Sequence, residues 1–189
     1  MGRQTRRAYK DMSPEQQEVF DSIARGRNGV SDGHIGGPFD AWILNAEMGK
    51  RIVGLGGLFR FRTQTDRRYI ELAILMVGRF WEAQFEWYAH APMAKEAGLP
   101  DDIIAAIKLG EMPTFSDAGD EAAWRICSEL LTTHEVSEPT YRAGVAAFGE
   151  QGVAEIVNVA GYYTMVSMTL NTFRVPLPEG AEYPFERKG

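Results

Sequence analysis

Apolar residues recur every three to four positions along most of the chain, the spacing that places them on one face of a helix. The first predicted helix begins at Ser13, which forms a capping box with Gln16 ahead of the apolar positions. Asp66 begins another, through the apolar run "IELAILMVG", with Gly78 as the predicted joint to the helix that follows. Further helices are predicted over 39–61, 80–98, 99–110, 117–134, 137–152 and 153–173.

No segment alternates apolar and polar residues as a half-buried strand does, so the pattern predicts an all-α bundle of about seven or eight helices. Residues 30–37 are rich in glycine and are predicted to form a loop. We expect one domain over 1–189, with an N-terminal arm and helix over 1–37 and a helical core over 38–178.

Composition and charge narrow the classes of partner. The 189 residues carry a formal net charge of −6, which gives no general attraction for nucleic acid or an anionic membrane. No apolar run is long enough to span a bilayer, and the N-terminus lacks the apolar run of a secretory signal. We therefore expect a cytoplasmic protein with no nucleic-acid or membrane partner.

The segment "FWEAQFEWYAHAPMAKEAGL", residues 80–99, concentrates aromatic and ionisable residues in a few helical turns. Glu86 and His90 are four residues apart and so share a helix face. Glu71 directly precedes the apolar run "LAILMVG" and is a candidate for a buried carboxylate. A carboxylate beside an imidazole orients the ring for proton transfer, so these three residues are the predicted catalytic groups. Trp87 and Tyr88 would shield them from water.

Plainer interpretations remain open for the same residues. Glu86 and His90 also fit a solvated surface pair, and the aromatic residues also fit a core or a subunit interface. Glu71 also fits an ion pair with one of three nearby arginines: Arg67, Arg68 or Arg79. Glu71, Glu86 and His90 are weak metal ligands as a set, so we expect no metal.

The run "RRYIELAILMVGRFWEAQFEWYAHAPMAKEAGLPDDIIAAI", residues 67–107, resembles the carboxymuconolactone decarboxylase family, which includes the alkylhydroperoxidases. The resemblance covers about 38–178 and implies an alkylhydroperoxidase-like helical fold. In the peroxidase branch a Glu is followed, twelve residues on, by Cys-x-x-Cys-x-x-x-His. Glu71 and His90 match this motif, but Ala83 and Glu86 occupy the cysteine positions. Cys127 is the chain's one cysteine, so a disulfide-cycling mechanism is not expected.

The decarboxylase branch has a Glu and a His four apart, similar to Glu86 and His90. The resemblance implies a cofactor-free lyase that decarboxylates a small cyclic carboxylate or lactone, with His90 as proton donor and Glu86 orienting it. Arg79, Trp87 and Tyr88 are then the substrate-binding candidates. Family members usually assemble as trimers or hexamers, so a homo-oligomer is expected. The alternatives are a redox protein lacking the cysteine pair and a small-molecule-binding protein without catalysis.

Overall fold

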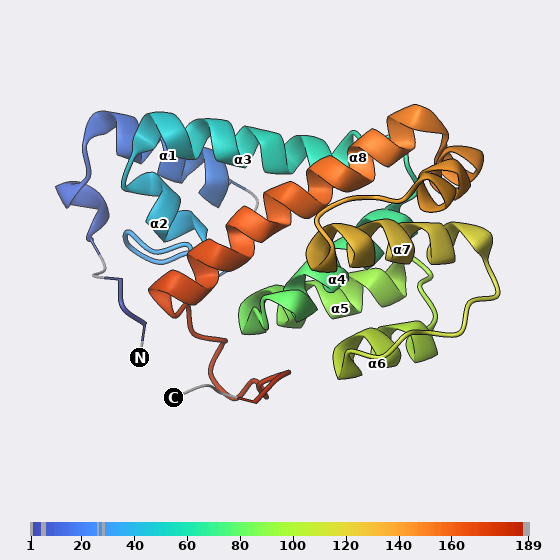
Figure 1. Ribbon diagram of the computed structural model, residues 1–189. Coiled ribbons are helices and arrows are strands. Elements are labelled where there is room, and N and C mark those ends of the chain that lie inside the picture. Colours follow the sequence, from blue (N-terminus) through green and yellow to red (C-terminus); the bar gives the residue numbers. More distant parts are fainter. Residues whose placement is uncertain (1, 5–6, 26, 28, 187–189) are drawn as a thin grey trace.

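The computed structural model describes residues 2–4, 7–25, 27 and 29–186, and within them the chain folds into helices (Figure 1). These are the 3-10 helix η1 (Tyr9–Asp11) and the α-helices α1 (Pro14–Ala24), α2 (Phe39–Ile43), α3 (Ala46–Phe61), α4 (Arg67–Phe80), α5 (Gln84–Glu96), α6 (Asp101–Leu109), α7 (Ala118–Thr132) and α8 (Glu138–Phe173). No strand occurs in the described residues beyond one isolated bridge between Ser31 and His34. The predicted all-α class is confirmed.

Helix α4 forms the centre of the main core and packs against α5, α6, α7 and α8. Six of its apolar side chains have no exposed surface: Ile70, Leu72, Ala73, Ile74, Leu75 and Val77. Because α4 has neighbours on several sides, it also carries the polar side chain of Glu71 into the core, with no exposed surface. A carboxylate in that position needs hydrogen-bond partners, and the packing of α4 decides which residues supply them.

Helix α8 crosses the length of the molecule (Figure 1). We predicted two helices here, 137–152 and 153–173. Helical structure instead extends from Glu138 to Phe173, and only Gly149 departs from it, with φ 69° and ψ 170°. The break therefore lies at Gly149 and not at the predicted boundary, because this backbone conformation is accessible mainly to glycine.

The N-terminal helices form a second, smaller apolar cluster of Val19, Phe20, Ile23 and Ile43. Phe39 and Val53 pack against both this cluster and the main core. The capping box of α1 is present as predicted. The single helix predicted over 39–61 is wrong, because the chain breaks into α2 and α3 where the Asn45 side chain accepts a hydrogen bond from the N–H of Met48.

None of the helices in the described part of the chain is both long and apolar enough to cross a membrane.

Candidate functional site

A tight turn between α4 and α5 brings Glu71 and His90 together. Helix α4 continues past Gly78, which we predicted as the joint, and ends at Phe80. Glu82 has a φ of 46°, and the N–H of Ala83 donates to the carbonyl of Gly78 over 2.8 Å, so the chain reverses within a few residues. Helix α5 then packs along α4, and His90 faces Glu71 across the contact between the two helices.

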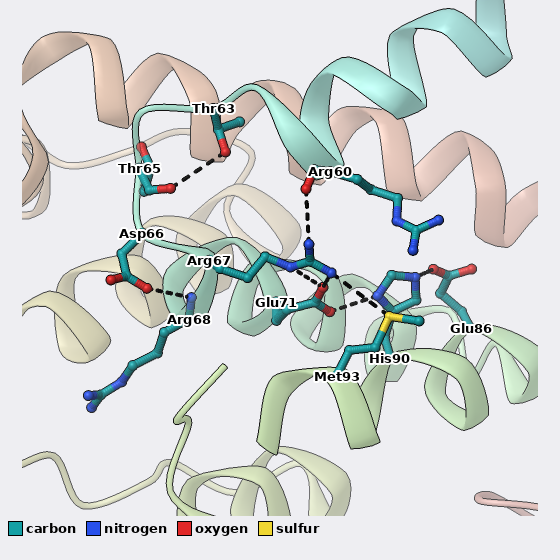
Figure 2. Close-up of polar contacts among 10 residues, drawn as sticks. All are labelled: Arg60, Thr63, Thr65, Asp66, Arg67, Arg68, Glu71, Glu86, His90 and Met93. Atoms are coloured by element: carbon teal, nitrogen blue, oxygen red, sulfur yellow. Dashed lines mark hydrogen bonds and ion pairs between the residues drawn. The ribbon is translucent and has the colours of Figure 1, made fainter. Parts of the chain in front are cut away.

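His90 lies between two carboxyl groups (Figure 2). Its Nδ1 is 2.7 Å from Glu71 Oε2, and its Nε2 is 3.1 Å from Glu86 Oε1. Only the first contact has hydrogen-bond geometry, and Glu86 Oε1 is buried without a hydrogen-bond partner among the described residues. The side chains of His90 and Glu86 are 9% and 5% exposed, so the pair is not a solvated surface pair.

Arg67 supplies the second contact of Glu71. Its Nε donates to Glu71 Oε1 over 2.7 Å, and its Nη1 donates to the backbone carbonyl of Arg60 over 2.9 Å. Arg68 and Arg79, the other two arginines considered, bond to other carboxylates. The two interpretations of Glu71 are therefore not exclusive, because the same carboxylate holds an arginine with one oxygen and the histidine with the other.

The two glutamates have opposite pKa shifts. Burial raises the pKa of Glu71, but the hydrogen bond and charge of His90 and the charge of Arg67 outweigh burial and leave that pKa lowered. Burial also raises the pKa of Glu86; the charge of His90 only partly offsets it, and the charge of Glu71 adds to it. An ionised Glu71 accepts hydrogen bonds only, so Nδ1 of His90 carries the proton that joins them.

Sequence reasoning linked neither Tyr163 nor Arg60 to this histidine. The Tyr163 ring, from α8, lies 5.1 Å from the His90 ring at an interplanar angle of 80°. Burial, followed by the charges of Glu86 and Glu71, raises the pKa of Tyr163 well above its ordinary value, so its hydroxyl stays protonated. Arg60, at the end of α3, extends toward His90 and Glu86 in Figure 2. No local spacing links either residue to α5, since both approach from other helices.

Comparison with known structures gives the fold a precedent. A protein of unknown function from Agrobacterium tumefaciens, for which a role as the antioxidant defence protein AhpD has been suggested, matches with a TM-score of 0.62 and 17% sequence identity. The match covers 71% of this chain and 93% of that one. The chain has an AhpD-like fold. No family model matches the sequence, and no curated protein matches it either.

The two positions that correspond to the cysteines of the alkylhydroperoxidase motif lie at the start of α5. Ala83 is the N-cap and has no exposed surface, and Glu86 lies in the first turn. Cys127 is buried in α7, where burial raises the pKa of its thiol to about 12. A thiolate nucleophile is therefore strongly disfavoured at Cys127 near neutral pH.

The three substrate-binding candidates lie outside the His90 cluster. Arg79 donates to Glu82 over 3.4 Å, and its guanidinium lies 5.4 Å from the centroid of the Phe185 ring. Trp87 is buried, and its ring packs edge-on against the same Phe185 at 5.2 Å. Tyr88 is 41% exposed. Arg79 and Trp87 thus hold the C-terminal tail against α5, and Tyr88 points to the surface instead of shielding His90.

No group of three His, Cys, Asp or Glu side chains in the described residues is arranged to hold a metal ion. Glu71, Glu86 and His90 do not form such a group because of their geometry. The two ring nitrogens of His90 face different carboxyl groups, so Glu71 and Glu86 lie on opposite sides of the imidazole.

A cavity of about 560 Å³ is formed by residues of the N-terminal arm, α1, α2, the loop before α2 and the segment after α8. Its lining includes His34 and Asp40, which form an ion pair, and Asp40 also accepts from the N–H of Ile35 over 2.8 Å. None of the predicted catalytic or substrate-binding residues lines this cavity.

Proposed function

We propose that the protein is a cofactor-free lyase that decarboxylates a small cyclic carboxylate or lactone by proton transfer. The observation that supports this most is the position of His90 between two carboxyl groups. Glu71 is ionised, and Glu86 is buried and has a raised pKa. Pairs of carboxyl groups driven apart in pKa are a usual arrangement for acid–base chemistry near neutral pH.

The His90 cluster can supply the proton that this reaction needs. Loss of carbon dioxide breaks a carbon–carbon bond and leaves its electron pair on the substrate, delocalised toward the lactone carbonyl. Product forms when an acid adds a proton to that carbon. Glu71 holds the Nδ1–H of His90, so the proton that moves is the one at Nε2, on the side of Glu86.

The hydrogen-bond geometry changes one role assigned from the sequence. We expected Glu86 to orient His90, but Glu71 makes the hydrogen bond that fixes the ring. Glu86 then serves as the second acid. Its raised pKa lets it keep a proton to higher pH than an exposed glutamate; it passes that proton to His90 after each turnover and takes up another from solvent.

Incubation with a carboxylated muconolactone tests the proposal, with release of carbon dioxide as the readout. We expect turnover by the wild type, with deuterium at the protonated carbon when the solvent is D₂O. His90→Asn should lower the rate by about 10²- to 10⁴-fold, the usual contribution of a positioned acid.

His134→Asn is the matched control, because His134 is exposed at the end of α7 and has a φ of 67° that asparagine tolerates. Its turnover should equal that of the wild type. Full turnover by His90→Asn would overturn the assignment, and binding of the lactone without consumption would favour the non-catalytic alternative.

We also infer that the subunits assemble as a trimer or hexamer. Helix α3 supports this, because it leaves Leu55, Leu58 and Phe61 44%, 46% and 71% exposed, a set of apolar side chains that association would cover. Sedimentation velocity tests the expectation, and a purely monomeric species at micromolar concentration would contradict it.

A further inference from the structure

Arg60 is a cation near His90 whose side chain has a buried N–H without an acceptor among the described residues. It belongs to the last turn of α3, and its backbone carbonyl is fixed by the hydrogen bond from Arg67. Its side chain is half-buried and extends over His90 and Glu86 in Figure 2. The Nε of Arg60 is buried and has no hydrogen-bond partner among the described residues. A buried guanidinium N–H normally has an acceptor, so this one points to an acceptor supplied from outside the chain.

The surrounding charges leave Arg60 without a carboxylate of its own. Arg67 takes Glu71, which also holds His90. Glu86 lies close enough for the charge of Arg60 to act on it, but burial favours the uncharged form of Glu86. No ion pair joins Arg60 to a carboxylate in the described part of the chain. The side of the cluster formed by Arg60 therefore has an excess of positive charge.

A second cation strengthens this excess. Arg27 lies with its guanidinium 4.3 Å from the centroid of the Phe39 ring. Burial lowers the pKa of Arg27, and the positive charge of Arg60 lowers that pKa further. Two positive charges that act on each other attract a small anion more strongly than either one alone.

We propose that Arg60 binds a carboxylate that the substrate keeps through the reaction, and so positions the reacting carbon beside His90. A guanidinium presents its N–H groups as a planar fork that matches a carboxylate, and the buried Nε is one arm of that fork.

The retained carboxylate suits Arg60 better than the one that leaves. A tight ion pair with the leaving group would stabilise the negative charge that must flow out of it, and this would slow the loss of carbon dioxide. A carboxylate that does not react is bound equally in the ground state and the transition state, so Arg60 lowers KM without this penalty. This inference rests on the proposed lyase function for its chemistry, but carboxylate binding can be measured without turnover.

Benzoate and benzamide form the first test, because they share a shape and differ in charge. Calorimetric titration of the wild type should show binding of benzoate in preference to benzamide. Arg60→Gln should weaken benzoate binding by about 10- to 100-fold, the usual effect of losing a charge-assisted contact, and leave benzamide unchanged. Arg60→Lys keeps the charge but loses the fork and should fall between the two. Arg62→Gln is the matched control, since Arg62 is exposed two residues on, and should bind as the wild type does.

Kinetics separate a positioning residue from a structural one. With the carboxylated muconolactone, Arg60→Gln should raise KM and leave kcat largely unchanged, and Arg60→Lys should recover part of the loss. Equal benzoate binding by the wild type and Arg60→Gln would overturn the inference, as would a wild type with no preference for benzoate. Loss of benzoate binding in Arg60→Gln, combined with no turnover by the wild type, would uphold the anion site and reject the lyase function.

Discussion

At the scale of single residues, Glu71 and Glu86 are both buried, but hydrogen bonding separates them. Glu71 accepts hydrogen bonds from Arg67 and His90, and Glu86 Oε1 accepts none from the described residues. Burial disfavours the charged form of both carboxyl groups, and only Glu71 has enough opposing interactions to reverse that effect. The same two residues are therefore expected to change stability in opposite directions with pH.

Glu71→Gln should destabilise the protein by about 2–3 kcal/mol at pH 7, because it removes the ionised acceptor that Arg67 and His90 share. The pKa of Glu71 is lowered in the folded state from its ordinary 4.5, so its stabilisation is complete above that value and is lost as pH falls through the folded pKa. Urea unfolding at several pH values checks this. Glu47→Gln is the control, because Glu47 forms an exposed ion pair with Arg51. An equal loss of stability from this variant would contradict the argument that burial makes Glu71 important.

Glu86→Gln should have the opposite pH dependence. The pKa of Glu86 is raised above its ordinary 4.5, so the folded state holds the proton more tightly and wild-type stability falls as pH rises from 4.5 through the folded pKa. Glutamine cannot ionise, so the stability of the variant relative to the wild type should increase across that window. The same unfolding series measures it, and a variant that loses stability relative to the wild type as pH rises would contradict the raised pKa.

At the scale of elements, the turns decide how the helices meet. The reversal at Glu82 lets α5 pack back on α4, and the break at Gly149 changes the course of α8 before it reaches His90 through Tyr163. Both features are single backbone conformations with positive φ. Only the second falls on a glycine, where such a conformation carries little strain.

Two glycine-to-alanine changes on α8 test this backbone argument. A Cβ at Gly149 or at Gly161 would meet no atom within 4 Å, so the two sites differ in backbone conformation and not in crowding. Gly149→Ala should destabilise by about 1–3 kcal/mol because of its φ of 69°. Gly161→Ala lies within regular helix and should stabilise by up to about 1 kcal/mol. Thermal unfolding compares them, and equal effects would show that the kink is not needed.

At the scale of the whole molecule, the one cysteine is enclosed by the helical core. Cys127 has no exposed surface and packs within the main cluster around α4. Burial raises the pKa of its thiol to about 12, so neither exposure nor ionisation favours reaction in the native state. A peroxidase that cycles a disulfide needs two accessible thiols, and this chain has one that is inaccessible.

The thiol of Cys127 should therefore report global unfolding. We expect almost no reaction with Ellman's reagent in the native state and one thiol per chain in denaturant. Ser116→Cys is the control, because residue 116 is exposed in the loop before α7 and its thiol should react at once. Rapid modification of Cys127 in the native protein, or dithiol-dependent consumption of peroxide, would contradict the enclosed position and favour the redox alternative.

The sequence by itself determined the helices and one contact of the site. Helical periodicity, the caps at Ser13 and Asp66 and the Glu86–His90 spacing depend on neighbours within about four residues, which the sequence shows directly. The break at Asn45 was missed and the break at Gly149 was misplaced, because periodicity tolerates short interruptions.

Only the tertiary structure decided the rest of the candidate site. The hydrogen bond of Glu71 to His90 depends on the turn at Glu82, and Tyr163 and Arg60 reach the histidine from α8 and α3. Such contacts join residues far apart in the chain, so no local pattern encodes them. The packing also places Arg79 and Trp87 against Phe185 of the C-terminal tail and leaves Tyr88 exposed, which no local pattern predicted.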